Sequence, residues 1–230
     1  MILCIETATG VCSVALCDEN RVISEAQAPP GMSHAAMLTV LIQKLLKEAS
    51  VTARQLDAVS VSKGPGSYTG LRIGVSVAKG IAYGAGIPLI GINTLTAMCH
   101  GYLSQKPLPE EGNILLCPMI DARRMEVYNA LFTLDGRMVK ETSADIITGA
   151  SYNDLLSTGK IVFFGNGADK CRSIITNVNA VFVGGFSLSA SYLHIPSVNA
   201  MREKRFEDVA YFEPYYLKEF IATIPKKLFL

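Results

Sequence analysis

Short apolar runs and two longer amphipathic stretches alternate through the first 93 residues of the chain. The stretch HAAMLTVLIQKLLKEA follows Ser33, a candidate N-cap, and predicts a helix over residues 34–49. A second helix is predicted over residues 69–83. Apolar or alternating runs typical of strands occupy residues 2–6, 11–17, 22–26, 56–62 and 88–93. This β-β-β-α-β-α-β order predicts an α/β fold with a mixed sheet flanked by helices.

A second unit begins near Asn113 and repeats the layout of the first. In both units an apolar strand ends in an acid, at Glu6 and at Asp121, and a turn, a strand, a polar turn and a third strand follow. Such an echo suggests a duplicated fold. Beyond it, the pattern predicts a helix over residues 151–157, strands over 161–168 and 180–183, and a helix over 197–211. We therefore expect two units, residues 1–105 and 106–230.

Both helices predicted for the first unit are unusually apolar or glycine-rich. The first leaves few polar positions for a helix that covers one side of a sheet. In the second, Gly70 and Gly74 share a face at a cost of up to about 1 kcal/mol each relative to alanine, which close approach of another segment would offset. One interpretation is burial inside the chain. The other, which we favour, is a subunit interface formed by Met37, Leu38, Leu41, Ile42, Leu45, Gly70, Leu71, Gly74, Val75, Val77 and Ala78.

The composition is half hydrophobic and only 18% charged, with a formal net charge of +1. So apolar a chain either has a large core or covers part of its surface with a partner. No apolar run reaches the roughly 18 residues of a membrane span, and the opening MILCIETATG lacks the basic start of a signal peptide. The six cysteines form no C-x-x-C pair and are expected to be reduced core residues, which indicates the cytoplasm.

Bulk charge does not draw this chain to nucleic acid. Basic residues cluster at Arg123 and Arg124, at residues 202–205 and at residues 226–227. We expect each cluster to be a solvated surface rather than a track for phosphates.

The glycine-rich segment KGPGSYTGLR resembles a phosphate-binding loop but lacks both fingerprints. A P-loop requires Gly-Lys-Ser/Thr after its glycines, whereas Lys63 precedes them here. In a dinucleotide loop the third glycine would come one residue before Gly70, and an acid would follow about 20 residues later. Gly66, stiffened by Pro65, is instead predicted to take a positive φ in a tight turn.

Candidate catalytic groups are sparse. The histidines His34, His100 and His194 lack metal-binding spacing, and no Gly-x-Ser-x-Gly elbow is present. We therefore predict neither a catalytic residue nor a metal ligand. Glu6 and Asp121 would face one another across a cleft between the units, a geometry that suits a magnesium nucleotide. The candidate nucleotide-binding residues are Glu6, Thr7, Gly64, Gly66 and Asp121.

Several stretches together resemble the bacterial TsaB (YeaZ) family. They are ILCIETAT, SHAAMLTVLI, KGPGSYTGLRIGVSVAKGIA, PLIGINTL, IDARRMEVYNALF and EPYYLK. The resemblance spans most of the chain and is strongest in its first 130 residues. It implies the actin-like ATPase (ASKHA) fold, with two RNase-H-like subdomains that would explain the internal echo.

The resemblance also implies a role. TsaD, the catalytic relative, carries two metal-binding histidines where this chain has Thr94 and Met98, and neither side chain replaces imidazole on iron or zinc. The family implies a non-catalytic scaffold that pairs with TsaD through the two N-terminal helices. TsaD then transfers threonylcarbamoyl to adenosine 37 of tRNAs that read ANN codons, and the ATPase TsaE acts on the same assembly.

Alone, such a protein is expected to form a homodimer through the same helices. The only cofactor the resemblance suggests is ATP or ADP at the subunit interface. Two alternatives stay open at this point. One is an actin-fold ATPase or phosphotransferase that uses Glu6, Thr7 and Asp121, and the other is a glycoprotease-like metal enzyme.

Overall fold

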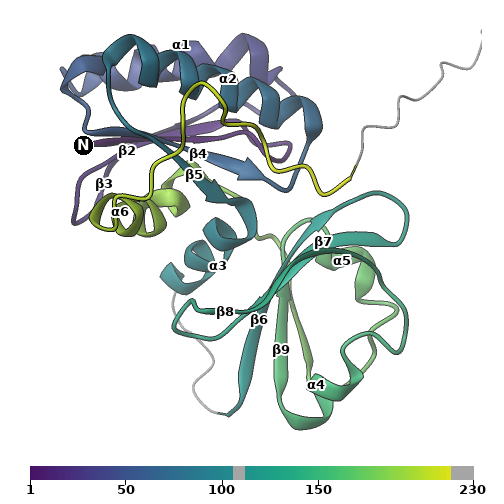
Figure 1. Cartoon of the computed structure of the whole chain (residues 1–230). Helices are drawn as coiled ribbons and strands as arrows, with labels where there is room; N and C mark the ends of the chain where they lie inside the picture. The colour runs from purple at the N-terminus through teal and green to yellow at the C-terminus, as the bar shows by residue number, and fades with distance from the viewer. Residues whose placement is uncertain (106–111, 219–230) are drawn as a thin grey trace, which may run out of the picture.

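The computed structural model describes residues 1–105 and 112–218 of the chain. Two halves, each built on a five-stranded mixed sheet, make up the molecule (Figure 1). None of the helices within these residues is long and apolar enough to cross a bilayer.

The first sheet has the strand order β3-β2-β1-β4-β5. Its strands are β1 (Ile2–Glu6), β2 (Ser13–Cys17), β3 (Val22–Gln27), β4 (Ala58–Gly64) and β5 (Leu89–Asn93). The first three are antiparallel neighbours, while β1, β4 and β5 run parallel. Every residue of β1 and β2 is buried, because helices cover both faces of the sheet.

Helices α1 (His34–Glu48) and α2 (Tyr68–Ala85) lie side by side on one face of this sheet (Figure 1). Side chains that alternate along β1, such as Leu3 and Ile5, pack against them. The intervening side chains, Ile2 and Cys4, pack on the opposite face. That opposite face is covered by α3 (Thr94–Ser104), η2 (Ala190–Leu193) and α6 (His194–Arg202). A short 3-10 turn, η1 (Ala53–Gln55), precedes β4.

The second sheet has the order β10-β9-β6-β7-β8. Its strands are β6 (Ile114–Asp121), β7 (Glu126–Phe132), β8 (Met138–Ile146), β9 (Lys160–Phe164) and β10 (Ala180–Val183). Helices α4 (Asn153–Thr158) and α5 (Ala168–Cys171) pack on one face. The other face joins the same apolar core as α3, so a single core continues from one half into the other.

The expected order of elements in the first unit is confirmed, and three details along the whole chain are corrected. No helix was predicted at α3. The helix predicted over residues 197–211 begins at His194 and ends at Arg202. The positive φ predicted for Gly66 belongs to Gly64, at +117°. Ser33 occupies the N-cap position of α1, although its side chain makes no capping hydrogen bond.

After α6 the chain returns to the first half as an extended strap, residues 203–216, which crosses α2 (Figure 1). Backbone bonds from Glu207 N–H to the Leu89 carbonyl (2.8 Å) and from Tyr215 N–H to the Lys63 carbonyl (2.6 Å) attach it to the sheet. The ammonium of Lys79 on α2 donates to the carbonyls of Ala210 and Phe212. The predicted division into residues 1–105 and 106–230 stays a prediction. Helix α6 and the strap come after residue 106 in the chain but pack on the first half.

The inward glycines of α2 allow the helix to lie directly against the turn that follows β1. A Cβ at Gly70 would collide with the carbonyl of Thr7, and a Cβ at Gly74 with the Thr7 hydroxyl. Gly80, on the exposed side of the same helix, has nothing within 4 Å of the equivalent position. The close approach inferred from the sequence therefore exists, and it lies within the chain.

We expect Gly74→Ala to lower the free energy of unfolding by about 1–3 kcal/mol, the usual cost of overpacking a core. Gly80→Ala is the matched control, and we expect it to raise that free energy by up to about 1 kcal/mol, because alanine favours helix and meets open space. Urea denaturation of the two variants measures both effects. Equal effects of the two substitutions would contradict the assigned contact.

Candidate functional site

The surface formed by α1 and α2 is the first candidate site, and its predicted residues divide by burial. Nine of the eleven predicted interface residues are buried within the chain: Leu38, Leu41, Ile42, Leu45, Gly70, Leu71, Gly74, Val75 and Ala78. They face the first sheet or the Thr7 turn, so they support the helices rather than present a surface. Met37 and Val77 stay partly exposed.

A different set of side chains faces outward. On α2, Ser76, Gly80 and Gly84 are exposed at four-residue spacing, and a Cβ at either glycine would meet open space. On α1, Val40 is 53% exposed. Near the end of α2, Tyr83 is 84% exposed. We call these five residues, together with Met37 and Val77, the outer helix face.

The α2 part of the outer helix face carries little charge, whereas α1 has the exposed Lys44, Lys47 and Glu48, of which Lys44 pairs with Glu48. Within α2 the charged residues are Arg72 and Lys79. Arg72 lies over the ring of Tyr68, 5.4 Å from its centroid, and Lys79 is bound to the strap. A glycine within a helix lowers stability relative to alanine, and Gly80 and Gly84 make no close contact with the described part of their own chain that would offset this loss. The sequence did not separate them from Gly70 and Gly74, because both pairs have the same spacing.

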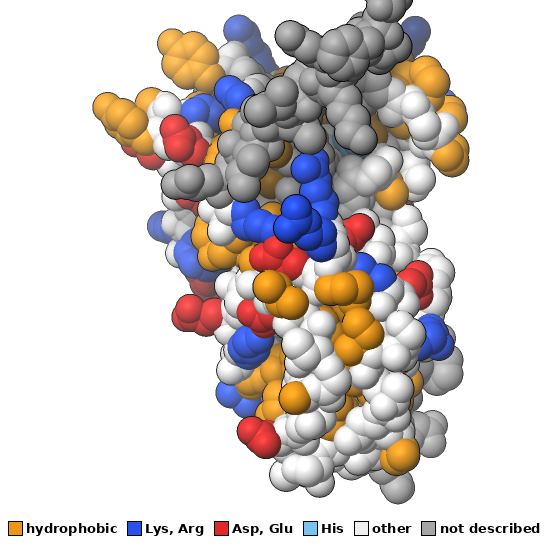
Figure 2. Space-filling view, turned by 90° about the vertical axis from the view of Figure 1, so that its right-hand side faces the viewer, with side chains coloured by type: hydrophobic (Ala, Val, Ile, Leu, Met, Phe, Trp, Pro, Cys, Tyr) orange, Lys and Arg blue, Asp and Glu red, His pale blue; other side chains and the backbone are white. Residues whose placement is uncertain are grey.

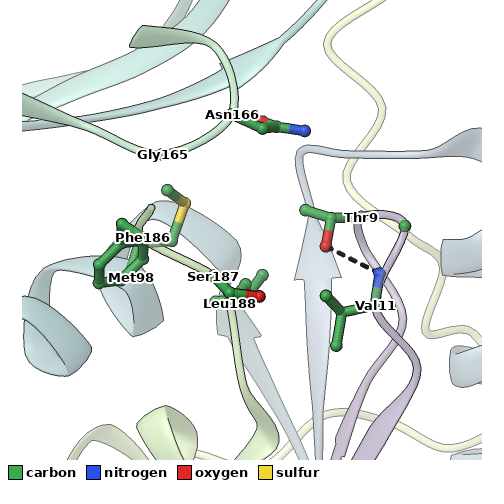
Figure 3. A pocket seen from close by; sticks show the side chains of 9 residues that line it. Thr9, Val11, Met98, Gly165, Asn166, Phe186, Ser187 and Leu188 are labelled. Atoms are coloured by element: carbon green, nitrogen blue, oxygen red, sulfur yellow. Dashed lines mark hydrogen bonds between the residues drawn. The ribbon is translucent and has the colours of Figure 1, made fainter. Parts of the chain in front are cut away.

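A cavity of about 240 Å³ between the two halves is the second candidate site. Figure 3 shows Thr9 and Val11 on one side, Met98 and Phe186 on the other, and Asn166 at the second half's edge. Its lining residues are Thr9, Gly10, Val11, Met98, Gly165, Asn166, Phe186, Ser187 and Leu188. These residues are uncharged and mostly apolar. None of the five candidate nucleotide-binding residues is among them.

Glu6 lies at the end of β1 with both carboxyl oxygens engaged. One oxygen accepts from the Ala8 N–H at 2.5 Å and the other from the Ser62 hydroxyl. Burial raises the pKa of Glu6 to about 7, against the opposing effect of these hydrogen bonds. Such a pKa is typical of functional acids. Here, however, the carboxyl is fully buried and holds β1, its turn and β4 together.

The neighbouring candidates have structural roles as well. Thr7 is buried against α2, and a Cβ at Gly66 would collide with Ala8. A Cβ at Gly64 would press on the Tyr215 carbonyl of the strap. Glu6, Thr7 and Gly66 therefore gather around one turn, Gly64 lies against the strap, and Asp121 belongs to the second half.

Asp121 ends β6 and is bound within its own half. Its carboxylate accepts from the ammonium of Lys170 at 2.5 Å and from the N–H of Arg123 at 2.8 Å. Its backbone N–H donates to the side chain of Asn166, which lines the cavity. Both acids stand at strand ends, as expected, but neither lines the cavity, and each is hydrogen-bonded within its own half.

Thr94 and Met98 stand on the first turns of α3, and both are buried. The Thr94 hydroxyl makes no hydrogen bond with any described residue. The Met98 methyl group lies against Gly165 at the wall of the cavity. Within residues 1–105 and 112–218, no three His, Cys, Asp or Glu side chains gather closely enough to hold a metal ion.

Two halves with mixed sheets joined around a central cavity define a protein of the actin-like ATPase fold. A YeaZ-like protein of Pseudomonas aeruginosa superposes with a TM-score of 0.81 at 24% identity, covering 94% of this chain and 99% of that one. The inorganic polyphosphate/ATP-glucomannokinase of Arthrobacter sp. strain KM has a TM-score of 0.50 at 12% identity, covering 87% and 98%. At these identities the likeness shows the fold alone.

The sequence comparisons define the family more narrowly. The family model described as TsaD, tRNA N6-adenosine threonylcarbamoyltransferase, matches residues 30–211. The chain is 28% identical over 223 residues to TsaB of Bacillus subtilis strain 168, covering 94% of this chain and 93% of the relative. It is 36% identical over 134 residues to TsaB of Escherichia coli strain K12, covering 58% and 55%, so that match spans about half of the relative. The chain belongs to the TsaB (YeaZ) family, which is related to TsaD.

The burial of Glu6 generates a prediction about pH. Unfolded glutamate ionises above about pH 4.5, whereas folded Glu6 keeps its proton to about pH 7. The folded state therefore binds more protons in this window, and stability falls as pH rises from about 4.5 to about 7. At about 1.4 kcal/mol per pKa unit, the loss is up to about 3 kcal/mol.

Urea denaturation across this pH range tests the prediction with Glu6→Gln, which removes the titration. The matched control is Glu48→Gln on the exposed side of α1, which is expected to keep the pH dependence of the unaltered chain. If Glu6→Gln also keeps it unchanged, the folded carboxyl titrates as it does in the unfolded chain.

Proposed function

We propose that this chain is a non-catalytic subunit that pairs with TsaD. In that assembly TsaD transfers threonylcarbamoyl to adenosine 37 of tRNAs that read ANN codons, with TsaE acting as the ATPase, in the cytoplasm. Family membership supports the pathway, because the relatives in Escherichia coli and Bacillus subtilis are named tRNA threonylcarbamoyladenosine biosynthesis proteins. The single observation that carries the pairing is the uncharged outer helix face with its two uncontacted glycines.

The docking partner packs its own helices against the outer helix face. Ser76, Gly80 and Gly84 form a ridge without bulky side chains, which lets a second helix approach the backbone of α2. Val40 and Tyr83 then supply exposed apolar surface at the sides of this ridge. In the absence of TsaD, the same face pairs two copies of this chain as a homodimer.

Three features support a non-catalytic role. The positions that correspond to the metal-binding histidines of TsaD hold the buried side chains of Thr94 and Met98. Neither is a suitable ligand for iron or zinc. Glu6 is enclosed by its hydrogen bonds, and Asp121 is paired with Lys170. An ATP or ADP at the subunit interface stays a prediction, with the partner supplying the charged groups.

Gly80→Leu tests the docking surface without disturbing the core, because a Cβ added at this exposed position has nothing of the described chain within 4 Å. We expect TsaD binding to weaken about tenfold or more, the effect of roughly 1.4 kcal/mol. Titration calorimetry of the purified pair measures the affinity, and a thermal melt confirms that the variant stays folded. Ser157→Leu, on exposed α4 of the second half, is the matched control.

Gly74→Leu is not a suitable alternative, because it would collide with Thr7 and disturb the fold itself. Unchanged affinity of Gly80→Leu for TsaD would rule out docking through the outer helix face. Failure of the unaltered chain to bind TsaD would refute the pairing as a whole.

A further inference from the structure

Two adjacent arginines are displayed on the turn between β6 and β7. The side chains of Arg123 and Arg124 are exposed. Both residues have left-handed backbone conformations, with φ of 71° and 45°. For residues other than glycine this conformation costs on the order of 1 kcal/mol each and occurs where the surroundings enforce it. The turn therefore needs a specific set of contacts to keep its shape.

Lys170 of α5 provides those contacts. Its ammonium donates to the Arg124 carbonyl at 2.8 Å, to the Glu126 carbonyl at 2.7 Å and to the Asp121 carboxylate at 2.5 Å. The same carboxylate accepts from the Arg123 N–H. The ammonium of Lys170 thus holds the backbone of the turn in one conformation. The two exposed arginine side chains extend from this fixed backbone.

The charges around this turn do not balance. Asp121 is paired with Lys170, and Glu126 with Lys218. Both of these acids are therefore paired with a lysine, and neither Arg123 nor Arg124 has an ion-pair partner among the described residues. The other basic cluster differs, since Arg202 is paired with Glu19 and Arg205 with Glu203.

The basic side chains gather in one place, with acidic side chains directly beside them (Figure 2). Figure 2 shows Lys and Arg side chains gathered at the middle of the face that lies on the right-hand side of Figure 1, where the β6–β7 turn is found. Tyr128 is close by: burial raises the pKa of its phenol, and the charges of Lys218 and Arg123 oppose that shift. Because the Tyr128 ring packs against the apolar core, the groups that this patch offers to a ligand are the guanidinium groups, which bind phosphate.

We propose, in place of the solvated surface expected from the sequence, that Arg123 and Arg124 contact the phosphate backbone of the RNA on which the assembly acts, an inference that rests on the proposed function. Guanidinium groups match the phosphodiester in charge and in paired hydrogen bonds. Two neighbouring arginines on a fixed turn reach two phosphates along one strand. The patch belongs to the second half, whereas the outer helix face belongs to the first, so RNA and TsaD occupy different surfaces.

The test compares Arg123→Gln/Arg124→Gln with a control of equal charge change, Arg202→Gln/Arg205→Gln. Fluorescence anisotropy with an unmodified tRNA that reads an ANN codon gives the affinity from 50 to 200 mM salt, for the isolated chain and for its assembly with TsaD. Each lost phosphate contact reduces the slope of log affinity against log salt by about 0.9. We expect a reduction of about 1.8 in the assembly for the first double variant and none for the control. Arg123→Lys/Arg124→Lys retains the charge and is expected to retain the slope.

Pairing with TsaD is measured separately, without tRNA, by titration calorimetry. A double variant that pairs normally and keeps the full salt slope overturns the inference while leaving the proposed function intact. A double variant that pairs weakly without tRNA also overturns it, because the patch then binds an acidic protein surface. If the unaltered chain fails to pair with TsaD, the proposed function fails. The RNA contact is then tested by comparing the salt dependence of tRNA binding between the isolated chain and its double variant.

Discussion

The contact between α2 and the turn after β1 is the constraint on which the first half depends. Gly70 and Gly74 let the helix backbone lie against Thr7, and the same turn accepts a hydrogen bond from Ser67 N–H to the Ala8 carbonyl at 2.7 Å. This contact sets how far α2 stands from the sheet. It therefore sets which residues of α2 are turned toward solvent, and the outer helix face is a consequence of packing on the inner side.

The sequence predicted that a glycine face of α2 makes a close contact, but it did not predict what that face contacts. Glycines at four-residue spacing indicate a close approach, yet the same spacing occurs on both sides of α2, and a pattern does not say which side meets its own chain. Helix α3 was missed for a related reason. Its residues are apolar nearly all round because it lies between two sheets, so no amphipathic period marks it.

The candidate polar residues show a similar limit. The sequence identified Glu6 and Asp121 as strand-end acids, and both stand at strand ends. It did not identify Ser62 or Lys170 as their partners, since those residues come from distant segments. The end of α6 was misplaced because the N–H groups of residues 203–205 bond back to the last turn of the helix, and Glu207 then pairs with Leu89 of β5. Local propensity carries no information about such partners.

The continuous core around α3 has a mechanical consequence. Enzymes with two lobes often open and close about a hinge to admit and enclose a substrate. Here Met98 and Leu95 of α3 share one apolar cluster with Ile90 of the first sheet and Phe164 of the second. Rotating one lobe against the other would expose that cluster to water. The shared core therefore opposes rotation of the two lobes, and a partner meets them in one relative orientation.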